Sequence, residues 1–255
     1  MFLEVENVTK KFGGLTALSD INFTMEEGKT TALVGPNGAG KTTMFNCIAG
    51  FYQVSEGDIK LRGKSIKGLK PYNILQKGIA RTFQQVRNFE GLTILDIIMT
   101  AAHTRSGQGF LNSMLFLPSV RKSEEKLREE ALDILNFFQI SDIAEKYPNE
   151  IPYGQKRLVE VAKVMATGAD LILLDEPAAG LNDYETDTLS KMIGSIQEKG
   201  KTILIIEHNM KFVMNLAEKI VVLNFGQKIA EGKPEEIRKD PKVISAYLGR
   251  EYSNA

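Results

Sequence analysis

A glycine-rich segment near the N-terminus has the residue types and spacing of a phosphate-binding loop. It reads GPNGAGKT and directly follows the apolar run TTALVG. The backbone N–H groups of such a loop turn inward around a phosphate, and the helix that follows adds the positive end of its dipole. We therefore predict that this segment binds a nucleotide. Its residues are Gly35, Pro36, Asn37, Gly38, Ala39, Gly40, Lys41, Thr42 and Thr43.

Two side chains of this loop have distinct chemical tasks. Lys41 is predicted to neutralise the β- and γ-phosphate oxygens and thus to act in catalysis, and the hydroxyl of Thr42 is predicted to ligate Mg²⁺. The alternative is a glycine-rich turn that matches the pattern by chance. The apolar strand before the loop and the helical segment after it argue against that alternative.

Carboxylates and a histidine follow two further apolar runs. Asp175 and Glu176 end LILLDE, and His208 ends TILIIEH. Ligands of open α/β sheets bind beyond the carboxyl ends of the strands, so we expect these side chains at the same edge as the phosphate loop. Asp175 suits Mg²⁺, Glu176 suits a general base that prepares a water, and His208 suits a hydrogen bond to a γ-phosphate. His103 has no comparable position and is interpreted as structural.

The hydrophobic pattern predicts the elements that position these groups. FLEVENV (2–8) and INFTM (21–25) alternate like half-exposed antiparallel strands, whereas TTALVG, LILLD and TILIIE are apolar throughout, as in strands buried on both faces of a parallel sheet. A helix is predicted over 123–139, with Ser123 as its N-cap. Its apolar face comprises Leu127, Ala131, Leu135 and Phe138. The fold class is therefore α/β, with an added antiparallel layer and a helical insertion.

Composition excludes several classes of protein. The 255 residues are 43% hydrophobic and 25% charged, and Lys plus Arg and Asp plus Glu both total 32, so no net charge favours nucleic acid as a partner. The single cysteine, Cys47, excludes an internal disulfide and is interpreted as a core thiol. The N-terminus is too charged for a signal peptide, and no run approaches the roughly 20 apolar residues of a membrane span. We therefore expect a cytoplasmic protein whose membrane association is peripheral.

The order of the motifs resembles one family over nearly the whole chain. GPNGAGKT, RTFQQ, IPYGQ, LILLDEP and IIEH follow one another as in the nucleotide-binding subunits of ATP-binding-cassette (ABC) transporters. The resemblance implies a P-loop NTPase (RecA-like) parallel-sheet core with an antiparallel β subdomain, formed by 1–90 and 155–255. It also implies a helical subdomain, formed by 91–154, which includes the family's signature segment, here IPYGQ. It also implies ATP and Mg²⁺ as ligands, with ATP hydrolysis coupled to transport.

A narrower resemblance concerns the transported substrate. The segments ARTFQQVRNFEGLTILDII, YGQ, DEPAAGLN and AYLG are similar to those of ATP-binding subunits that serve branched-chain amino-acid uptake. Lipopolysaccharide-export and urea-uptake ATPases are close relatives and stay open as alternatives. The competing class is a soluble ABC ATPase that acts on ribosomes or in DNA repair and not in transport. Such proteins usually carry two cassettes or long coiled-coil insertions, whereas this sequence shows one cassette and no such insertion.

The resemblance assigns further residues and partners. It implies that Gln84 joins Mg²⁺ and the attacking water to the permease, and that Phe12 stacks on adenine, a ring that could instead be a core aromatic. It also implies that two subunits, identical or related, sandwich two ATP molecules, each signature facing the other subunit's phosphate loop. The expected partners are transmembrane permease subunits and, indirectly, a substrate-binding protein, with the chain on the cytoplasmic face of the membrane.

The signature segment departs from the family pattern. IPYGQ replaces the usual Leu-Ser-Gly-Gly-Gln, so Pro152 stands where a serine hydroxyl would bond the γ-phosphate. Proline suits the first turn of a helix, and the backbone N–H groups and dipole of that helix are predicted to keep the phosphate contact. The nucleotide-binding residues predicted here are Tyr153, Gly154 and Gln155. The stripe Leu158, Val161, Ala162 and Met165 predicts the helix, and Gly168 its end.

Three other features leave alternatives open. Asn182 stands where the family usually has Asp, which places a contact between subunits in doubt. The apolar stretch 106–120 either packs on the helical subdomain or forms a surface for the permease or the bilayer. Pro152 also allows a nucleotide-binding regulator without hydrolysis, against which Glu176 and His208 argue.

Overall fold

The computed structural model describes residues 1–82, 91–104 and 118–248, and these form two compact units. The first unit comprises Met1–Arg81 and Asp170–Ala255, and the second comprises Thr82–Ala169. The helical subdomain was predicted over 91–154, whereas the second unit starts earlier, at Thr82, and ends later, at Ala169. Residues 155–169 belong to the second unit because the helix that begins at Tyr153 packs against the other helices of that unit.

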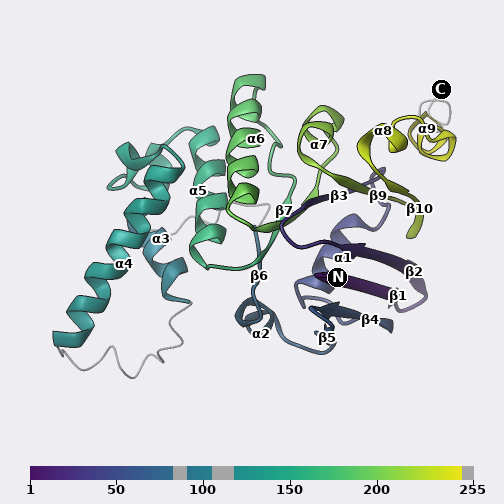
Figure 1. Cartoon of the computed structure of the whole chain (residues 1–255), viewed down its shortest axis with the longest axis horizontal. Coiled ribbons are helices and arrows are strands. Elements are labelled where there is room, and N and C mark those ends of the chain that lie inside the picture. The colour runs from purple at the N-terminus through teal and green to yellow at the C-terminus, as the bar shows by residue number, and fades with distance from the viewer. Residues whose placement is uncertain (83–90, 105–117, 249–255) are drawn as a thin grey trace. The chain divides into compact units, whose positions relative to one another are not determined.

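A six-stranded sheet forms the centre of the first unit, in the order β10-β9-β3-β8-β7-β6 (Figure 1). All neighbours are parallel except β9 and β10. The strands are β3 (Thr30–Val34), β6 (Ile79–Arg81), β7 (Leu171–Asp175), β8 (Thr202–Ile206), β9 (Lys219–Asn224) and β10 (Gln227–Gly232). Every residue of β3, β7 and β8 is buried, which confirms the prediction made from their continuous apolar runs.

A second sheet of this unit is antiparallel, in the order β2-β1-β4-β5. Its strands are β1 (Leu3–Phe12), β2 (Leu15–Met25), β4 (Glu56–Leu61) and β5 (Lys64–Ser65). The strands predicted at 2–8 and 21–25 are therefore confirmed, but both are longer than predicted. They extend to a tight turn in which Phe12 pairs with Leu15 and Gly13 has a φ of 56°.

The main core of the first unit joins both sheets through helix α1 (Lys41–Ile48). Phe45, Met44 and Ile48 are fully buried in this cluster. Cys47 lies in the same cluster as a free thiol, and its burial raises its pKa to about 11. The thiol is therefore protonated at neutral pH, which agrees with its interpretation as a core residue.

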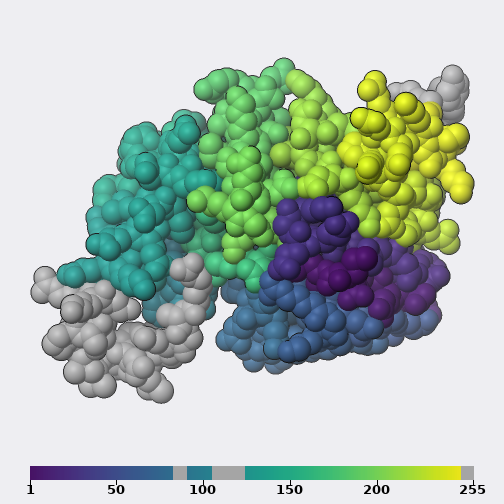
Figure 2. Space-filling model, viewed as in Figure 1, coloured from purple at the N-terminus to yellow at the C-terminus, as the bar shows by residue number. Residues whose placement is uncertain are grey.

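Helices of the first unit flank the central sheet (Figure 1). They are α2 (Pro71–Gln76), α6 (Asp183–Glu198), α7 (Met210–Leu216), α8 (Pro234–Ile237) and α9 (Pro241–Leu248). Asn182 caps α6, because its side chain accepts a hydrogen bond from the N–H of Glu185 at 3.0 Å. Figure 2 shows α7 and the C-terminal helices side by side at the surface of this unit.

The regular elements in the described residues of the second unit are helices. The unit contains α3 (Ile94–His103), α4 (Pro118–Phe137), α5 (Tyr153–Ala166) and the 3₁₀ turns Ser141–Ile143 and Pro148–Glu150. Helix α3 packs against α4 and α5. Residues 106–117 of the stretch 106–120 lie outside the described residues, so both interpretations of it stay predictions.

The start of α4 corrects one prediction. The helix begins at Pro118, five residues before Ser123, so Ser123 is an internal residue and not the N-cap. The proline itself marks the start, since its fixed φ is compatible with a first helical turn. The predicted apolar face is otherwise sound: Ala131, Leu135 and Phe138 are buried, and Leu127 is half-buried.

Within the described part of the chain, no helix is long and apolar enough to cross a membrane.

Candidate functional site

An open pocket of about 510 Å³ surrounds the phosphate loop in the first unit. It lies where β3 passes into α1, beside the turn between β1 and β2, the loop after β7 and the turn between β9 and β10. Residues predicted from the sequence form much of its lining, and others join them. The lining comprises Phe12, Leu15, Thr16, Ala17, Asn37, Gly38, Ala39, Gly40, Lys41, Thr42, Thr43, Glu176, Phe225 and Gly226.

The backbone of the loop requires glycine at two of its positions. Gly35 and Gly40 have positive φ values of 150° and 103°. A β-carbon on Gly35 would lie 2.1 Å from the carbonyl oxygen of Leu223, and one on Gly40 would lie 2.9 Å from that of Ala17. The loop is thus held tightly between neighbouring backbone segments. The predicted strand–loop–helix arrangement is confirmed.

Lys41 reaches back across the loop. Its Nζ donates hydrogen bonds to the carbonyl oxygens of Gly35, at 2.7 Å, and Pro36, at 3.1 Å. The side chain is buried, yet the residue lines the pocket. Lys41 is the first residue of α1, so its buried charge lies near the positive end of the helix dipole. Because only neutral carbonyl oxygens accept these two hydrogen bonds, the site favours binding of an anion.

Asp175 ends β7 and is held by Arg81, a residue that the sequence interpretation did not assign. Arg81 ends β6 and donates a hydrogen bond from Nη2 to Oδ2 of Asp175 at 2.6 Å and one from Nη1 to the side chain of Asn46 at 2.5 Å. Burial raises the pKa of Asp175, and the Arg81 guanidinium partly offsets that effect. The sequence signal was only an arginine at the end of an apolar strand, a position where arginine most often faces solvent.

Breaking this buried pair is expected to destabilise the first unit. Arg81→Leu would leave the Asp175 carboxylate, whose side chain is 0% exposed, without its guanidinium partner, and should lower the free energy of unfolding by about 3–5 kcal/mol. Denaturant unfolding measures the change. Arg62→Leu is the matched control, because Arg62 pairs with Glu27 and Asp170 at half-exposed positions and should lose only about 0–1 kcal/mol. Equal losses in the two variants would contradict the importance of burial.

Glu176 and His208 approach each other at the carboxyl ends of β7 and β8. Nδ1 of His208 lies 4.0 Å from Oε1 of Glu176. Glu176 has a φ of 47°, in the left-handed region that a residue with a side chain rarely adopts. Such backbone strain clusters at functional sites, where the surrounding structure maintains it. The predicted proximity of the two strand ends is confirmed.

Glu207 is a second residue that the sequence interpretation missed. Its carboxylate is 1% exposed and accepts hydrogen bonds from the backbone N–H groups of Ala178 (2.8 Å), His208 (3.0 Å) and Asn209 (3.3 Å). It therefore joins the loop after β7 to the loop after β8. The signal was a charged residue at the end of an apolar run, which the motif IIEH contained.

Two aromatic rings lie at the rim of the pocket. Phe12, predicted to stack on adenine, is 41% exposed and contacts Tyr52 edge to face, with ring centroids 5.1 Å apart. Phe225, in the turn between β9 and β10, is 80% exposed and was not predicted. An exposed ring of this kind offers a stacking surface for a base.

The signature segment belongs to the second unit. Pro152 is the N-cap of α5, one position before the predicted first turn, since its ψ of 158° is extended. Its carbonyl accepts the N–H of Lys156 at 3.1 Å, and Tyr153 and Gly154 are the first two residues of the helix. Gly168, with a φ of 72°, follows the end of α5 as predicted.

The buried face of α5 differs from the predicted stripe. Val161 and Ala162 are buried as predicted, but Leu158 and Met165 are only half-buried, while Arg157 and Glu160 are buried. Lys163 bonds Glu160 at 2.7 Å, and the guanidinium of Arg157 lies 5.2 Å from the ring centroid of Tyr153. Long polar side chains with such partners can be buried, which an apolar pattern does not reveal. Gln84 lies outside the described residues, so its role stays a prediction.

Comparison with known proteins agrees with the fold and the loop. The family described as "ABC transporter" matches residues 18–179, and the family described as "Branched-chain amino acid ATP-binding cassette transporter" matches residues 227–253. The chain is 44% identical over 248 residues to the high-affinity branched-chain amino acid transport ATP-binding protein BraF of Pseudomonas aeruginosa, with 97% of each chain covered. It is 39% identical to the corresponding protein LivG of Escherichia coli K12, with the same coverage.

A solved structure is similar over nearly the whole chain. It is the ADP conformation of MJ1267, an ATP-binding cassette of an ABC transporter, with a TM-score of 0.85 and 33% identity. The match covers 97% of this chain and 98% of that chain. The phosphate loop, the strand-end carboxylates and these similarities together show that the chain belongs to the ABC transporter family, as one of its ATP-binding ATPase cassettes.

Proposed function

We propose that this chain hydrolyses ATP for a transporter that imports branched-chain amino acids. The observation that carries the proposal is the pocket in which the phosphate loop and Glu176 meet, in a chain that shares 44% and 39% identity with branched-chain amino acid transport ATP-binding proteins.

The residues of the pocket fit a nucleotide bound with Mg²⁺. Thr42, which lines the pocket, and Asp175, which is buried outside the lining, carry hard oxygen donors, which Mg²⁺ prefers. The described residues contain no group of three or more His, Cys, Asp or Glu side chains that could hold a metal ion by themselves. This favours an ion held jointly by one or two protein ligands and the phosphates of the nucleotide. When bound, the ion would neutralise charge on the transferred phosphoryl group.

The chain's own groups supply the rest of the mechanism. Lys41 and the backbone N–H groups of the loop stabilise negative charge on the phosphates. Glu176 orients and deprotonates the attacking water. His208, whose Nδ1 lies 4.0 Å from Oε1 of Glu176, donates a hydrogen bond to the γ-phosphate. Gln84 is assigned to the water and the metal ion. Phe12 stacks on adenine from the rim of the pocket, where Phe225 offers a second ring.

Closure of a dimer would couple hydrolysis to transport. Two cassettes would enclose two ATP molecules, with Tyr153, Gly154 and Gln155 of each facing the other's phosphate loop. Closure on ATP and opening after hydrolysis would then drive two conformations of membrane permease subunits, to which a substrate-binding protein delivers the amino acid. The chain would act at the cytoplasmic face of the membrane, in contact with the permease.

Reconstitution with the permease tests this function. The chain, its permease subunits and the substrate-binding protein would be placed in vesicles containing ATP, and uptake of labelled leucine would be measured alongside phosphate release. We expect leucine to be taken up and ATP to be hydrolysed. Phosphate release that is unaffected by leucine, urea or lipopolysaccharide would favour a non-transport ATPase, and no release would favour a nucleotide-binding regulator.

Pro152→Ser is expected to strengthen the phosphate contact made by the signature. The serine hydroxyl would add one hydrogen bond to a charged group, worth about 1.5–3 kcal/mol, at the N-terminus of α5. We expect a higher ATP turnover or a tighter ATP-dependent dimer, measured by phosphate release and by sedimentation. Turnover and dimerisation that both remain unchanged would contradict a phosphate-facing Pro152.

A further inference from the structure

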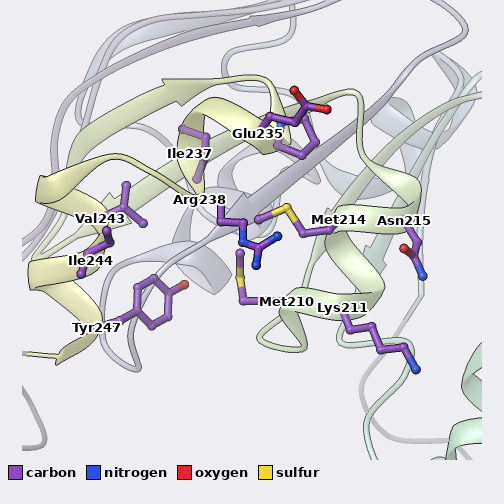
Figure 3. A pocket seen from close by; sticks show the side chains of 11 residues that line it. Met210, Lys211, Met214, Asn215, Glu235, Ile237, Arg238, Val243, Ile244 and Tyr247 are labelled. Atoms are coloured by element: carbon purple, nitrogen blue, oxygen red, sulfur yellow. The ribbon is translucent and has the colours of Figure 1, made fainter.

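A second pocket, of about 740 Å³, lies between α7, α8 and α9 in the first unit (Figure 3). Its volume is within the range of small-molecule sites, roughly 300–1,000 Å³. None of its residues lines the pocket at the phosphate loop. The lining comprises Met210, Lys211, Met214, Asn215, Pro234, Glu235, Ile237, Arg238, Val243, Ile244 and Tyr247.

The walls of this C-terminal pocket are mainly apolar. Met210 and Met214 come from α7, Ile237 from α8, and Val243 and Ile244 from α9. Ile244 is 43% exposed, which is unusual for a large aliphatic side chain inside a concavity. Methionine side chains adapt to ligands of varied shape. The walls therefore suit a hydrocarbon chain.

One cation extends into this apolar space. Figure 3 shows the guanidinium of Arg238 directed into the pocket, between the sulfur atoms of Met210 and Met214 in this view, whereas the carboxylate of Glu235 points away from it. Lys211 stands at the side of the pocket. Across the described ranges, neither Arg238 nor Lys211 forms a salt bridge. Among the residues that the structure describes, the pocket thus offers a positive charge that no salt bridge engages, which suits a carboxylate.

Tyr247 connects the C-terminal pocket to the phosphate loop. Its ring lines the pocket and packs against the buried cluster that contains Val34, the residue before Gly35. Burial raises the pKa of the Tyr247 hydroxyl, and the nearby backbone N–H of Gly35 partly offsets that effect, although the buried hydroxyl forms no hydrogen bond within the described residues. Gly35 lies close against the carbonyl of Leu223 and has little room to move. A displacement of Tyr247 would therefore change the conformation of the phosphate loop at Gly35.

We propose that the C-terminal pocket binds an aliphatic carboxylate and that its occupancy changes the affinity of the phosphate loop for nucleotide. The hydrocarbon chain lies among the methionines and the α9 aliphatic side chains, and the carboxylate pairs with Arg238. Tyr247, which borders both regions, transmits the change. The coupling rests on nucleotide binding at the loop, but the carboxylate site itself does not depend on the proposed transport function.

Octanoate binding to the full chain without nucleotide tests the site. Calorimetry should show saturable binding of one octanoate per chain, while octylamine, with the same chain and the opposite charge, should not bind. Arg238→Glu should weaken octanoate binding by about tenfold or more, equivalent to about 1.4 kcal/mol. Lys239→Glu makes the same change of charge one residue away, outside the pocket lining, and should leave binding unchanged.

A second ligand separates a fatty carboxylate from the transported amino acid. Leucine carries an ammonium group, and the Glu235 carboxylate that could pair with it points away from the pocket (Figure 3). Leucine should therefore bind at least about tenfold more weakly than octanoate. Leucine that binds as tightly as octanoate would overturn the ligand class. Equal effects of Arg238→Glu and Lys239→Glu, or no octanoate binding, would overturn the site.

Nucleotide affinity tests the coupling. Saturating octanoate should change the dissociation constant of ADP by about fivefold or more, and ADP should change that of octanoate by the same factor, because linkage is reciprocal. Tyr247→Phe keeps the ring in the wall and removes the hydroxyl near Gly35, so octanoate should still bind while the coupling is lost. Unchanged ADP affinity in the unsubstituted chain, or full coupling in Tyr247→Phe, would overturn the regulatory role.

Discussion

Replacing Glu176 by Gln is expected to abolish ATP hydrolysis while leaving ATP binding intact. Glutamine has the same shape and can occupy the same pocket, but its amide cannot accept a proton from water. Loss of a general base typically lowers the rate by about 10²–10⁴-fold. Phosphate release would measure turnover, and equilibrium dialysis with labelled ATP would measure binding. We expect turnover to fall by at least about 100-fold, with ATP affinity unchanged or higher.

The same variant should accumulate a closed dimer. If hydrolysis reopens the dimer, a cassette that binds ATP without hydrolysing it will stay closed, and size-exclusion chromatography with ATP should show twice the monomer mass. Glu198→Gln is the control, because Glu198 is an exposed residue at the end of α6 that does not line the pocket. Near-normal turnover of Glu176→Gln would remove Glu176 from its role as the base.

The phosphate-loop region was predictable because its signals are local. GPNGAGKT defines a strand, a loop and a helix within a few residues, and the apolar runs that become β3, β7 and β8 are too continuous to face water. The ends of parallel strands meet at one sheet edge, so the proximity of Glu176 and His208 followed from topology alone.

Arg81 and Glu207 were missed because their partners are distant in sequence. Arg81 bonds Asp175 across 94 residues, and Glu207 bonds Ala178 across 29 residues. The hydrophobic pattern of the sequence identifies Arg81 and Glu207 only as charged residues next to apolar strands. Charged residues in such positions most often face solvent. The geometry that makes them internal is set by the order of β6, β7 and β8 in the sheet.

The second unit was predicted less completely for a different reason. The start of α4 was misplaced because Ser123 is a good N-cap, whereas the signal for the actual start was Pro118, which suits a first helical turn. The boundary at 154 was misplaced because a signature motif marks chemistry and not the edge of a compact unit. Packing of α5 with α3 and α4 decides that edge.

Removal of the Glu207 carboxylate should impair catalysis although Glu207 does not line the pocket. In Glu207→Ala, the N–H groups of Ala178, His208 and Asn209 lose a common acceptor, and each such charge-assisted bond is worth about 1.5–3 kcal/mol. The loops after β7 and β8 would separate, displacing His208 from Glu176. A misplacement of about 1 Å can lower the rate about 10²-fold, so we expect kcat to fall about 10- to 100-fold with little change in KM for ATP.

The split between kcat and KM separates positioning from general loss of structure. Glu207→Gln keeps one carbonyl acceptor and should recover part of the activity, whereas a fold that merely lost stability would show normal kcat once corrected for the folded fraction, measured by circular dichroism. Glu198→Ala provides the matched control at an exposed site. If folded Glu207→Ala turns over ATP as fast as this control, Glu207 does not position His208, and the strained conformation of Glu176 must be maintained by other contacts.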